Sequence, residues 1–187
     1  MNIPNALTLF RIILIPVLVV VFYLPFPGSY LTCAALFALA GITDWLDGYL
    51  ARRLGQSTPL GAFLDPVADK LMVAVALALL IERFNAPWFT IPAVVIIGRE
   101  IVISALREWM AELGKRTSVA VSYLGKVKTT VQIIAIIGLL MFPPEQYWYW
   151  DMLSLSCLYV AAVLTLWSMI VYLRAAWPDL RSVPNKK

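Results

Sequence analysis

Histidine is absent from this sequence of 187 residues, and cysteine occurs only twice, as Cys33 and Cys157. Without histidine, neither a Ser–His catalytic relay nor a His-ligated metal site is available. The two cysteines stand far apart in apolar runs, so they support neither a zinc pattern nor a disulfide framework. Both are typical of small buried hydrophobic residues.

Charged residues are also scarce. They make up 14% of the chain, against 61% hydrophobic residues and a mean hydropathy of +0.83. A soluble domain has about 25% charged residues, and a core of this size cannot bury so much apolar surface. Much of that surface must therefore face lipid. The net charge of +4 is too small and too dispersed to indicate nucleic-acid binding.

Six stretches are long enough to cross a bilayer as helices, which takes about 20 apolar residues each. Turn-forming residues separate them, as in Pro25–Gly28 and Gly55–Pro59. The sequence therefore predicts an all-α, polytopic membrane protein, a single domain over residues 1–187, with six transmembrane helices around a polar cavity. A short interfacial segment, about 1–7, and a polar tail, about 175–187, flank them. The predicted helices cover Thr8–Leu24, Tyr30–Leu54, Leu60–Ile81, Pro87–Met110, Leu124–Met141 and Met152–Arg174.

Basic residues are concentrated at one set of helix ends. The loops at the opposite ends contain only Arg83. Basic segments are retained in the cytoplasm, so we expect both termini to face that side. The residues at the basic ends are Arg52, Arg53, Lys115, Arg116, Lys126, Lys128, Arg174, Arg181, Lys186 and Lys187.

Four aspartates lie inside or at the mouth of the second and third predicted helices: Asp44, Asp47, Asp65 and Asp69. An aspartate near the centre of a membrane helix costs about 2.5–3.5 kcal/mol to insert. Four of them place a burden of roughly 10 kcal/mol on the fold by the same scale. Water, cations or both must compensate for it.

The spacing of these aspartates places each pair on one helix face. Asp44 and Asp47 are three residues apart, and Asp65 and Asp69 are four apart. Because a short connection makes the two helices antiparallel neighbours, the pairs can converge. Oxygen ligands without histidine or thiolate favour a hard divalent cation, Mg²⁺ or Mn²⁺. Two such ions could clamp both oxygens of an in-line displacement at phosphorus.

Other interpretations of these acids stay open. Two acids that flank a span can be ordinary solvated helix ends, and a glycine in a membrane helix often serves packing. Acids within a membrane also line the proton or cation pathways of transporters.

The run Asp44-Trp-Leu-Asp47-Gly48-Tyr-Leu-Ala51-Arg52, followed at fixed spacing by Gly61, Asp65 and Asp69, resembles the CDP-alcohol phosphotransferase signature at every fixed position. The resemblance implies a six-helix membrane fold, usually homodimeric, with a site open to the cytoplasm. It also implies two divalent cations and a CDP-linked lipid donor.

Carried over by position, the resemblance implies a role for each signature residue. Asp44 and Asp65 would bridge both cations, Asp47 would bind the first, and Asp69 the second. Asp69 would also be the general base. Contacts to the CDP group would come from Gly48, Arg52 and Thr58, with Asn5 and Thr8 as further nucleotide contacts.

A second polar set lies outside the signature, at Arg99, Ser104, Arg107, Lys126 and Lys128. Arg99 lies deep in the fourth predicted helix, where an unpaired guanidinium is costly, so we expect it to point into the cavity. Together these side chains could bind an acceptor that carries its own phosphate. Alternatively, Arg99 pairs with Glu100 or an aspartate, and Arg107, Lys126 and Lys128 extend to lipid headgroups.

Three segments, 2–11, 98–107 and 124–130, resemble the bacterial branch of this family that makes phosphatidylglycerophosphate and CMP. In that branch the donor is CDP-diacylglycerol and the acceptor is sn-glycerol 3-phosphate. The resemblance therefore implies a phosphatidyltransferase of phospholipid biosynthesis in the bacterial inner membrane. The alternatives are a cardiolipin-, serine- or inositol-type transferase and, from a different class, a small membrane transporter.

Overall fold

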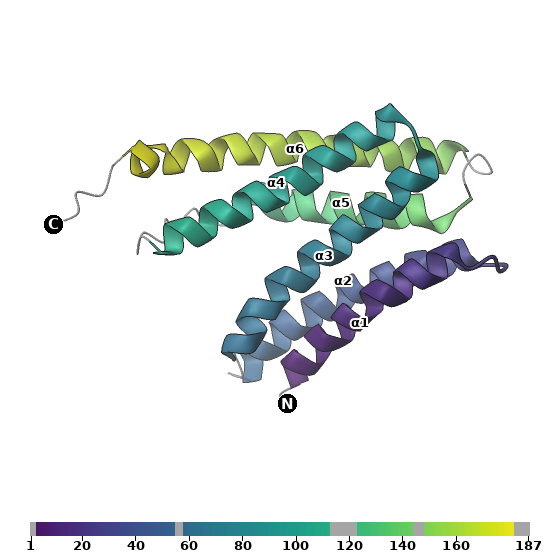
Figure 1. The fold of residues 1–187 in the computed structure, drawn as a ribbon, viewed down its shortest axis with the longest axis horizontal. Helices are drawn as coiled ribbons and strands as arrows, with labels where there is room; N and C mark the ends of the chain where they lie inside the picture. The colour runs from purple at the N-terminus through teal and green to yellow at the C-terminus, as the bar shows by residue number, and fades with distance from the viewer. Residues whose placement is uncertain (1–2, 55–57, 113–122, 144–147, 182–187) are drawn as a thin grey trace.

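The computed structural model describes residues 3–54, 58–112, 123–143 and 148–181 (Figure 1). These ranges form helices and their connections and contain no strand. The helices are α1 (Ile3–Tyr23), α2 (Ser29–Leu54), α3 (Pro59–Phe84), α4 (Pro87–Glu112), α5 (Tyr123–Met141) and α6 (Trp148–Arg181). The all-α architecture predicted from the sequence is therefore confirmed.

Local chemistry fixes where several of these helices begin and end. Thr58 caps the start of α3, where its hydroxyl accepts a hydrogen bond from the backbone N–H of Gly61, and Pro59 fills the first helical position. Asn85 ends α3 in the left-handed conformation, with φ 41°. Gly28, with φ 92°, turns the chain from α1 into α2.

Successive helices run in opposite directions, so the starts of α1, α3 and α5 lie at the same end as the C-terminal ends of α2, α4 and α6 (Figure 1). Helix α1 packs against α2 and α3, and α5 packs against α2 and α6. Helix α4 packs against α3 and α6. Helices α2 and α3, which carry the four aspartates, thus have neighbours on several sides.

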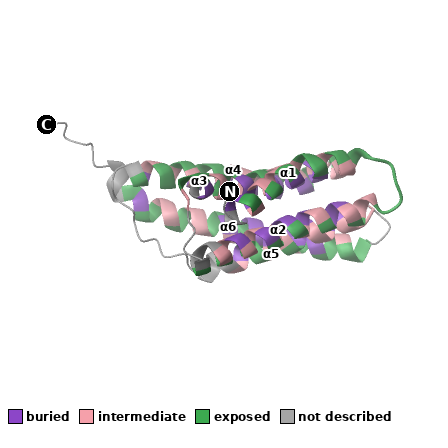
Figure 2. Cartoon of the chain, turned by 90° about the horizontal axis from the view of Figure 1, so that it is seen from below, coloured by how far each residue is buried: buried purple, intermediate pink, exposed green. Residues whose placement is uncertain are grey.

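Large apolar side chains point both inward and outward. Leu18, Leu77 and Ile136 are fully buried in the core, whereas Phe63 and Trp167 are more than 60% exposed. Buried and exposed positions alternate along the helices (Figure 2). An outer surface with so many exposed apolar side chains is typical of a protein in contact with lipid.

Among the residues that the structure describes, four helices contain stretches that are long and apolar enough to cross a membrane: Asn5–Tyr23, Ser29–Leu50, Pro87–Ala111 and Trp148–Trp177. They indicate a membrane protein. The apolar part of α5, Val127–Met141, is shorter, and α3 carries several charges along its length. Helix α1 already begins at Ile3 and α6 continues to Arg181, within the segments predicted as interfacial and polar.

Candidate active site

Three of the four aspartates converge on one buried arginine of α1. The guanidinium of Arg11 is 3.1 Å from Asp44 and also binds Asp47 and Asp69. Arg11 is only 1% exposed, and Asp47 is almost as deeply buried. One guanidinium offers five N–H donors, enough to hold carboxylates from two helices at once. Because three carboxylates face a single positive charge, the site keeps an excess of negative charge when they are ionised.

The fourth aspartate is held by a different residue of α1. The Thr8 hydroxyl donates a hydrogen bond of 2.5 Å to Asp65 Oδ1. Thr8 is 1% exposed and lies one turn of helix before Arg11. One face of α1 therefore contacts all four signature aspartates, two on α2 and two on α3.

The start of α1 also meets the start of α3. The Thr58 hydroxyl donates a hydrogen bond to Asn5 Oδ1 at 2.9 Å and accepts one from the backbone N–H of Gly61 at 3.0 Å. A Cβ atom at position 61 would lie 2.7 Å from Asn5 Oδ1. Glycine at this signature position therefore permits a close approach, and it brings together Asn5 and Thr58, two predicted nucleotide contacts.

The other predicted nucleotide contacts are less fully described. Gly48 follows Asp47 directly on α2 and is half-buried. Arg52 belongs to the last turn of α2, but its side chain lies outside the described residues, as does that of Lys126 on α5.

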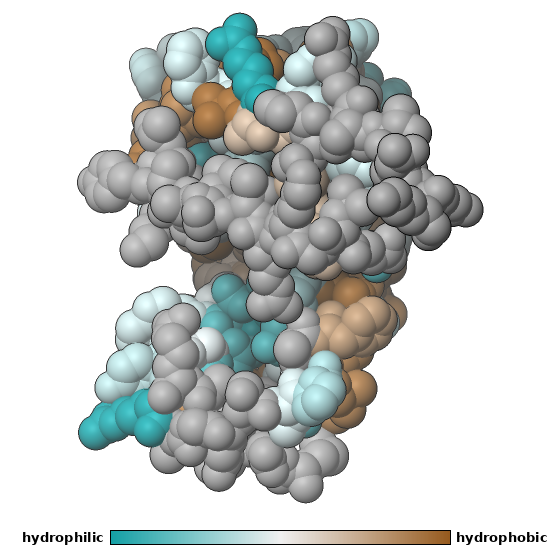
Figure 3. Space-filling model, turned by 90° about the vertical axis from the view of Figure 1, so that its left-hand side faces the viewer, coloured by the Kyte–Doolittle hydropathy of each residue, from teal (hydrophilic) through white to brown (hydrophobic). Residues whose placement is uncertain are grey.

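Two cavities meet at Asp69. The smaller one, about 100 Å³, lies beside Arg11 and Asp44 and reaches Thr129 of α5. The larger one, about 350 Å³, is lined by Asp65, Asp69, Lys70, Glu100, Arg107 and further residues. Figure 3, which looks onto the end of the molecule at the left of Figure 1, shows hydrophilic atoms gathered in a recess at this end. The carboxylate of Asp69 is thus accessible from both cavities.

The second predicted polar set separates into two groups. Arg99 is 8% exposed and donates hydrogen bonds to Glu100 at 2.8 Å and to Ser168 of α6 at 2.9 Å. It is not among the described residues that line the larger cavity. Arg107 does line that cavity and donates to the Tyr172 hydroxyl at 3.0 Å. Ser104 accepts a hydrogen bond from Lys70.

The pairing of Arg99 with Glu100 matches the alternative that the sequence left open. Glu100 Oε1 also accepts a hydrogen bond from Lys128 at 3.0 Å, so one carboxylate compensates two cations. Sequence reasoning gave no role to Arg11 or Lys70, and it did not predict that Lys128 pairs with Glu100. The signal that could have found them is the insertion cost of a charge inside an apolar span.

The donor chemistry of the four aspartates fits a hard divalent cation, because all the ligands would be carboxylate oxygens. Their present geometry is arranged around Arg11 and Thr8. Within the described ranges, no three His, Cys, Asp or Glu side chains are placed to hold a metal ion together. Cation binding would therefore require carboxylate oxygens to turn from the guanidinium toward the ion.

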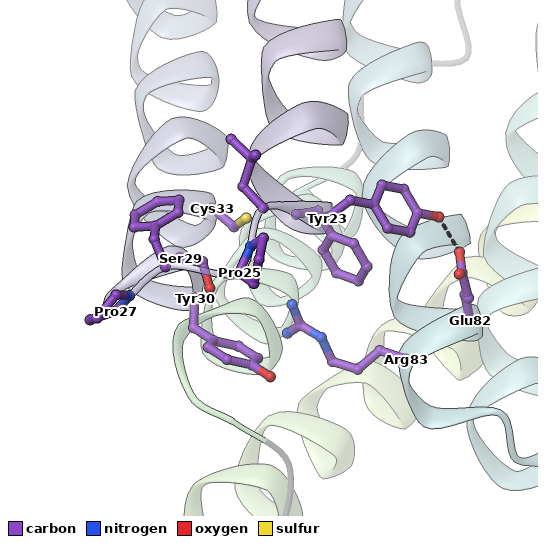
Figure 4. Close-up of a pocket in the computed structure, with 11 residues that line it drawn as sticks. Tyr23, Pro25, Pro27, Ser29, Tyr30, Cys33, Glu82 and Arg83 are labelled. Carbon is purple, nitrogen blue, oxygen red and sulfur yellow. Dashed lines mark hydrogen bonds between the residues drawn. The ribbon is translucent and has the colours of Figure 1, made fainter.

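A third pocket, about 480 Å³, lies at the opposite end of the molecule (Figure 4). The Arg83 guanidinium lies 4.4 Å from the centre of the Phe22 ring and 4.5 Å from that of Tyr30. It also donates to the Leu139 carbonyl at 3.2 Å. Beside it, the Tyr23 hydroxyl donates to Glu82.

Comparison with known proteins gives the family. Residues 1–173 match the model of the CDP-alcohol phosphatidyltransferase family. Relatives named CDP-diacylglycerol–glycerol-3-phosphate 3-phosphatidyltransferase include one from Yersinia enterocolitica, 57% identical over 96% of this chain and 97% of the relative. One from Sodalis glossinidius is 58% identical over the same shares. One from Pseudomonas fluorescens is 56% identical over 100% of this chain and 96% of its own length. This chain therefore belongs to the CDP-alcohol phosphatidyltransferase family.

Proposed function

We propose that this chain transfers the phosphatidyl group of CDP-diacylglycerol to the 1-hydroxyl of sn-glycerol 3-phosphate. The products are phosphatidylglycerophosphate and CMP. The observation that carries this proposal is the likeness of almost the whole chain to relatives named for that reaction. The convergence of the signature aspartates beside a cavity with two basic residues supports it from the structure.

Asp69 is proposed as the general base. It lines both cavities, so its carboxylate can reach an alcohol in the larger one and a phosphorus held near Asp44. In the proposed step, Asp69 takes the proton of the 1-hydroxyl, and the alcohol oxygen forms a bond to the phosphorus that carries diacylglycerol. The bond between that phosphorus and the CMP oxygen breaks. An alcohol is a poor nucleophile at neutral pH, so removing its proton lowers a main barrier.

Asp44, Asp47, Asp65 and Asp69 are proposed to hold two divalent cations, Mg²⁺ or Mn²⁺. When bound, such ions supply positive charge that neutralises the diphosphate of the donor and the departing CMP. Thr8 orients Asp65 through its hydrogen bond, and Arg11 holds the other three carboxylates together. These contacts keep the acids converged.

The nucleotide of the donor is proposed to bind where α1, α2 and α3 meet. Asn5 and Thr58 already contact each other there, and Gly61 allows α1 and α3 to approach closely. Thr8, Gly48 and Arg52 complete the proposed set. The acceptor phosphate is proposed to bind at Ser104, Arg107 and Lys126, of which Arg107 lines the larger cavity. Arg99, which the sequence grouped with them, pairs with Glu100 and Ser168 instead.

The membrane arrangement is also a proposal: six transmembrane helices in a bacterial inner membrane, both termini and the site facing the cytoplasm, and a homodimer. The charge asymmetry of the loops supports this orientation, because Arg83 is the only basic residue of the sequence in the loops opposite to the basic helix ends. We also propose that residues 1–187 form a single domain.

The test is a transfer assay with purified protein in detergent, CDP-diacylglycerol, MgCl₂ and radiolabelled sn-glycerol 3-phosphate. We expect labelled phosphatidylglycerophosphate and one CMP per product, and no turnover in excess EDTA. Parallel reactions use serine, inositol and phosphatidylglycerol as acceptors, with Asp69→Asn as the inactive control. CMP release with one of these acceptors but not with sn-glycerol 3-phosphate would assign a different transferase, and no release with any acceptor would favour transport.

A further inference from the structure

Several carboxylates line the larger cavity, and they would repel an anionic acceptor that entered without compensating positive charge. Asp65, Asp69 and Glu100 all line it. A phosphate monoester that enters this space meets like charges, which raises the free energy of binding unless cations compensate. The cationic side chains that are available in the cavity therefore decide which acceptors can bind.

Two of the cationic side chains near the cavity already form ion pairs with a carboxylate. Arg99 and Lys128 both bind the carboxylate of Glu100, at 2.8 and 3.0 Å, and both are more than 90% buried. Removing either from Glu100 would leave a buried charge unpaired, which is costly. These two side chains neutralise Glu100, and they are poorly placed to bind a phosphate as well.

Lys70 differs from both. It follows Asp69 on α3, lines the larger cavity and donates a hydrogen bond to Ser104 of α4. Within the described part of the chain, no salt bridge joins Lys70 to a carboxylate, and the same holds for Arg107 across the cavity. The ammonium group of Lys70 therefore keeps its charge available while Ser104 fixes its position.

We propose that Lys70, together with Arg107, binds the phosphate of the acceptor and so selects phosphorylated alcohols. This inference rests on the proposed function and adds a specificity residue to it. A lysine ammonium is a common phosphate ligand that acts as a point charge. Because Lys70 neighbours Asp69 on the same helix, a phosphate held there places the rest of a short acceptor beside the general base. A neutral alcohol gains nothing from Lys70.

The central test compares Lys70→Met with wild type in the transfer assay. Methionine keeps an unbranched chain of similar length and removes the charge. We expect the KM for sn-glycerol 3-phosphate to rise at least tenfold, since a hydrogen bond to a charged group contributes about 1.5–3 kcal/mol. The KM for CDP-diacylglycerol should stay within about twofold of wild type, a change well below that loss. Lys70→Arg should recover much of the affinity for the acceptor.

The matched control is Arg53→Met, which removes one positive charge outside the cavity. Arg53 is exposed, and its guanidinium donates a hydrogen bond to the hydroxyl of Tyr49 on the same helix. An equal rise in KM with Arg53→Met would assign the effect to the overall field of the protein and overturn the proposal. A loss shared equally by both substrates would indicate a structural role for Lys70 and also overturn the proposal.

A binding measurement covers the case in which Lys70→Met turns over too slowly. In the Asp69→Asn background, calorimetry with sn-glycerol 3-phosphate should show binding that the added Lys70→Met change weakens at least tenfold, as for KM. Equal binding with and without Lys70, in a protein that melts like its parent, would refute the inference and leave the proposed function intact. Failure of the wild type to use sn-glycerol 3-phosphate would refute both.

Discussion

Arg11 and Arg83 lie at opposite ends of the helices, and each is held in a different way. Arg11 is surrounded by the carboxylates of Asp44, Asp47 and Asp69. Arg83 lies between the rings of Phe22 and Tyr30 and donates to a backbone carbonyl. The first environment has more negative charge than its arginine can balance, whereas the hydrogen bond and the ring contacts of Arg83 are made to uncharged groups.

This contrast distinguishes a site whose carboxylates can bind a divalent ion as well as the arginine from a site that has no ligands for such an ion. Carboxylates that share one guanidinium can also accept a divalent ion, because such ions prefer oxygen ligands. Aromatic rings and one carbonyl offer no comparable ligand set. We therefore expect substitutions at the two ends to differ both in activity and in their response to Mg²⁺.

The largest difference should follow from removing one acid at each end. Asp69→Asn should lower turnover by about 10²–10⁴-fold, the usual contribution of a general base. Glu82→Gln, at the opposite end, keeps an acceptor for the Tyr23 hydroxyl and should leave turnover unchanged. Both are measured as CMP release at saturating substrates. Turnover of Asp69→Asn equal to wild type would remove Asp69 from the proposed mechanism.

The next largest effect concerns stability. Arg11→Gln should lower the free energy of unfolding by about 3 kcal/mol in EDTA, the lower part of the range for breaking a buried ion pair. The lower value applies because Asp44 and Asp69 are 47% and 43% exposed, so water screens part of their repulsion. Millimolar Mg²⁺ should restore part of the loss, since the ion replaces the missing positive charge.

Thermal unfolding in detergent, with EDTA and with MgCl₂, measures this effect. Arg11→Lys is the matched control, because it keeps the charge but offers fewer donors. If Mg²⁺ stabilised Arg11→Gln no more than wild type, the guanidinium and the cation would not share these carboxylates.

A smaller effect is expected at the other end. Arg83→Gln should cost about 1–2 kcal/mol of stability, from the loss of its contacts to two rings and to the Leu139 carbonyl. Mg²⁺ should not restore it, and turnover at a temperature where the variant is folded should equal that of wild type. A fall in turnover with unchanged stability would show that the two ends are coupled.

The sequence predicts the helices well because apolar length and turn residues are local properties. The break predicted at Pro25–Gly28 lies between the end of α1 and the start of α2, and Pro87, the predicted start of the fourth helix, begins α4. The convergence of the aspartates also follows from the spacing on α2 and α3 and the short connection between them. No long-range information is needed for either inference.

The partners of the buried arginines, in contrast, cannot be predicted from local sequence. Arg11 meets aspartates more than thirty residues away, and that pairing depends on how α1 packs against α2 and α3. Arg99 was expected to point into the cavity, but Ser168 becomes available to it because α4 packs against α6. Insertion cost predicts that such charges find partners, and only the tertiary arrangement decides which.

Asp69 borders the space proposed for the donor as well as the space proposed for the acceptor. A change at that position therefore alters the handling of both substrates together. Redesign toward another alcohol has more freedom at Lys70, Arg107 and Gln132, which border the larger cavity and not the smaller one. Among relatives that accept different alcohols, sequence differences should then occur mainly at these positions of the larger cavity, while the aspartate at position 69 stays the same.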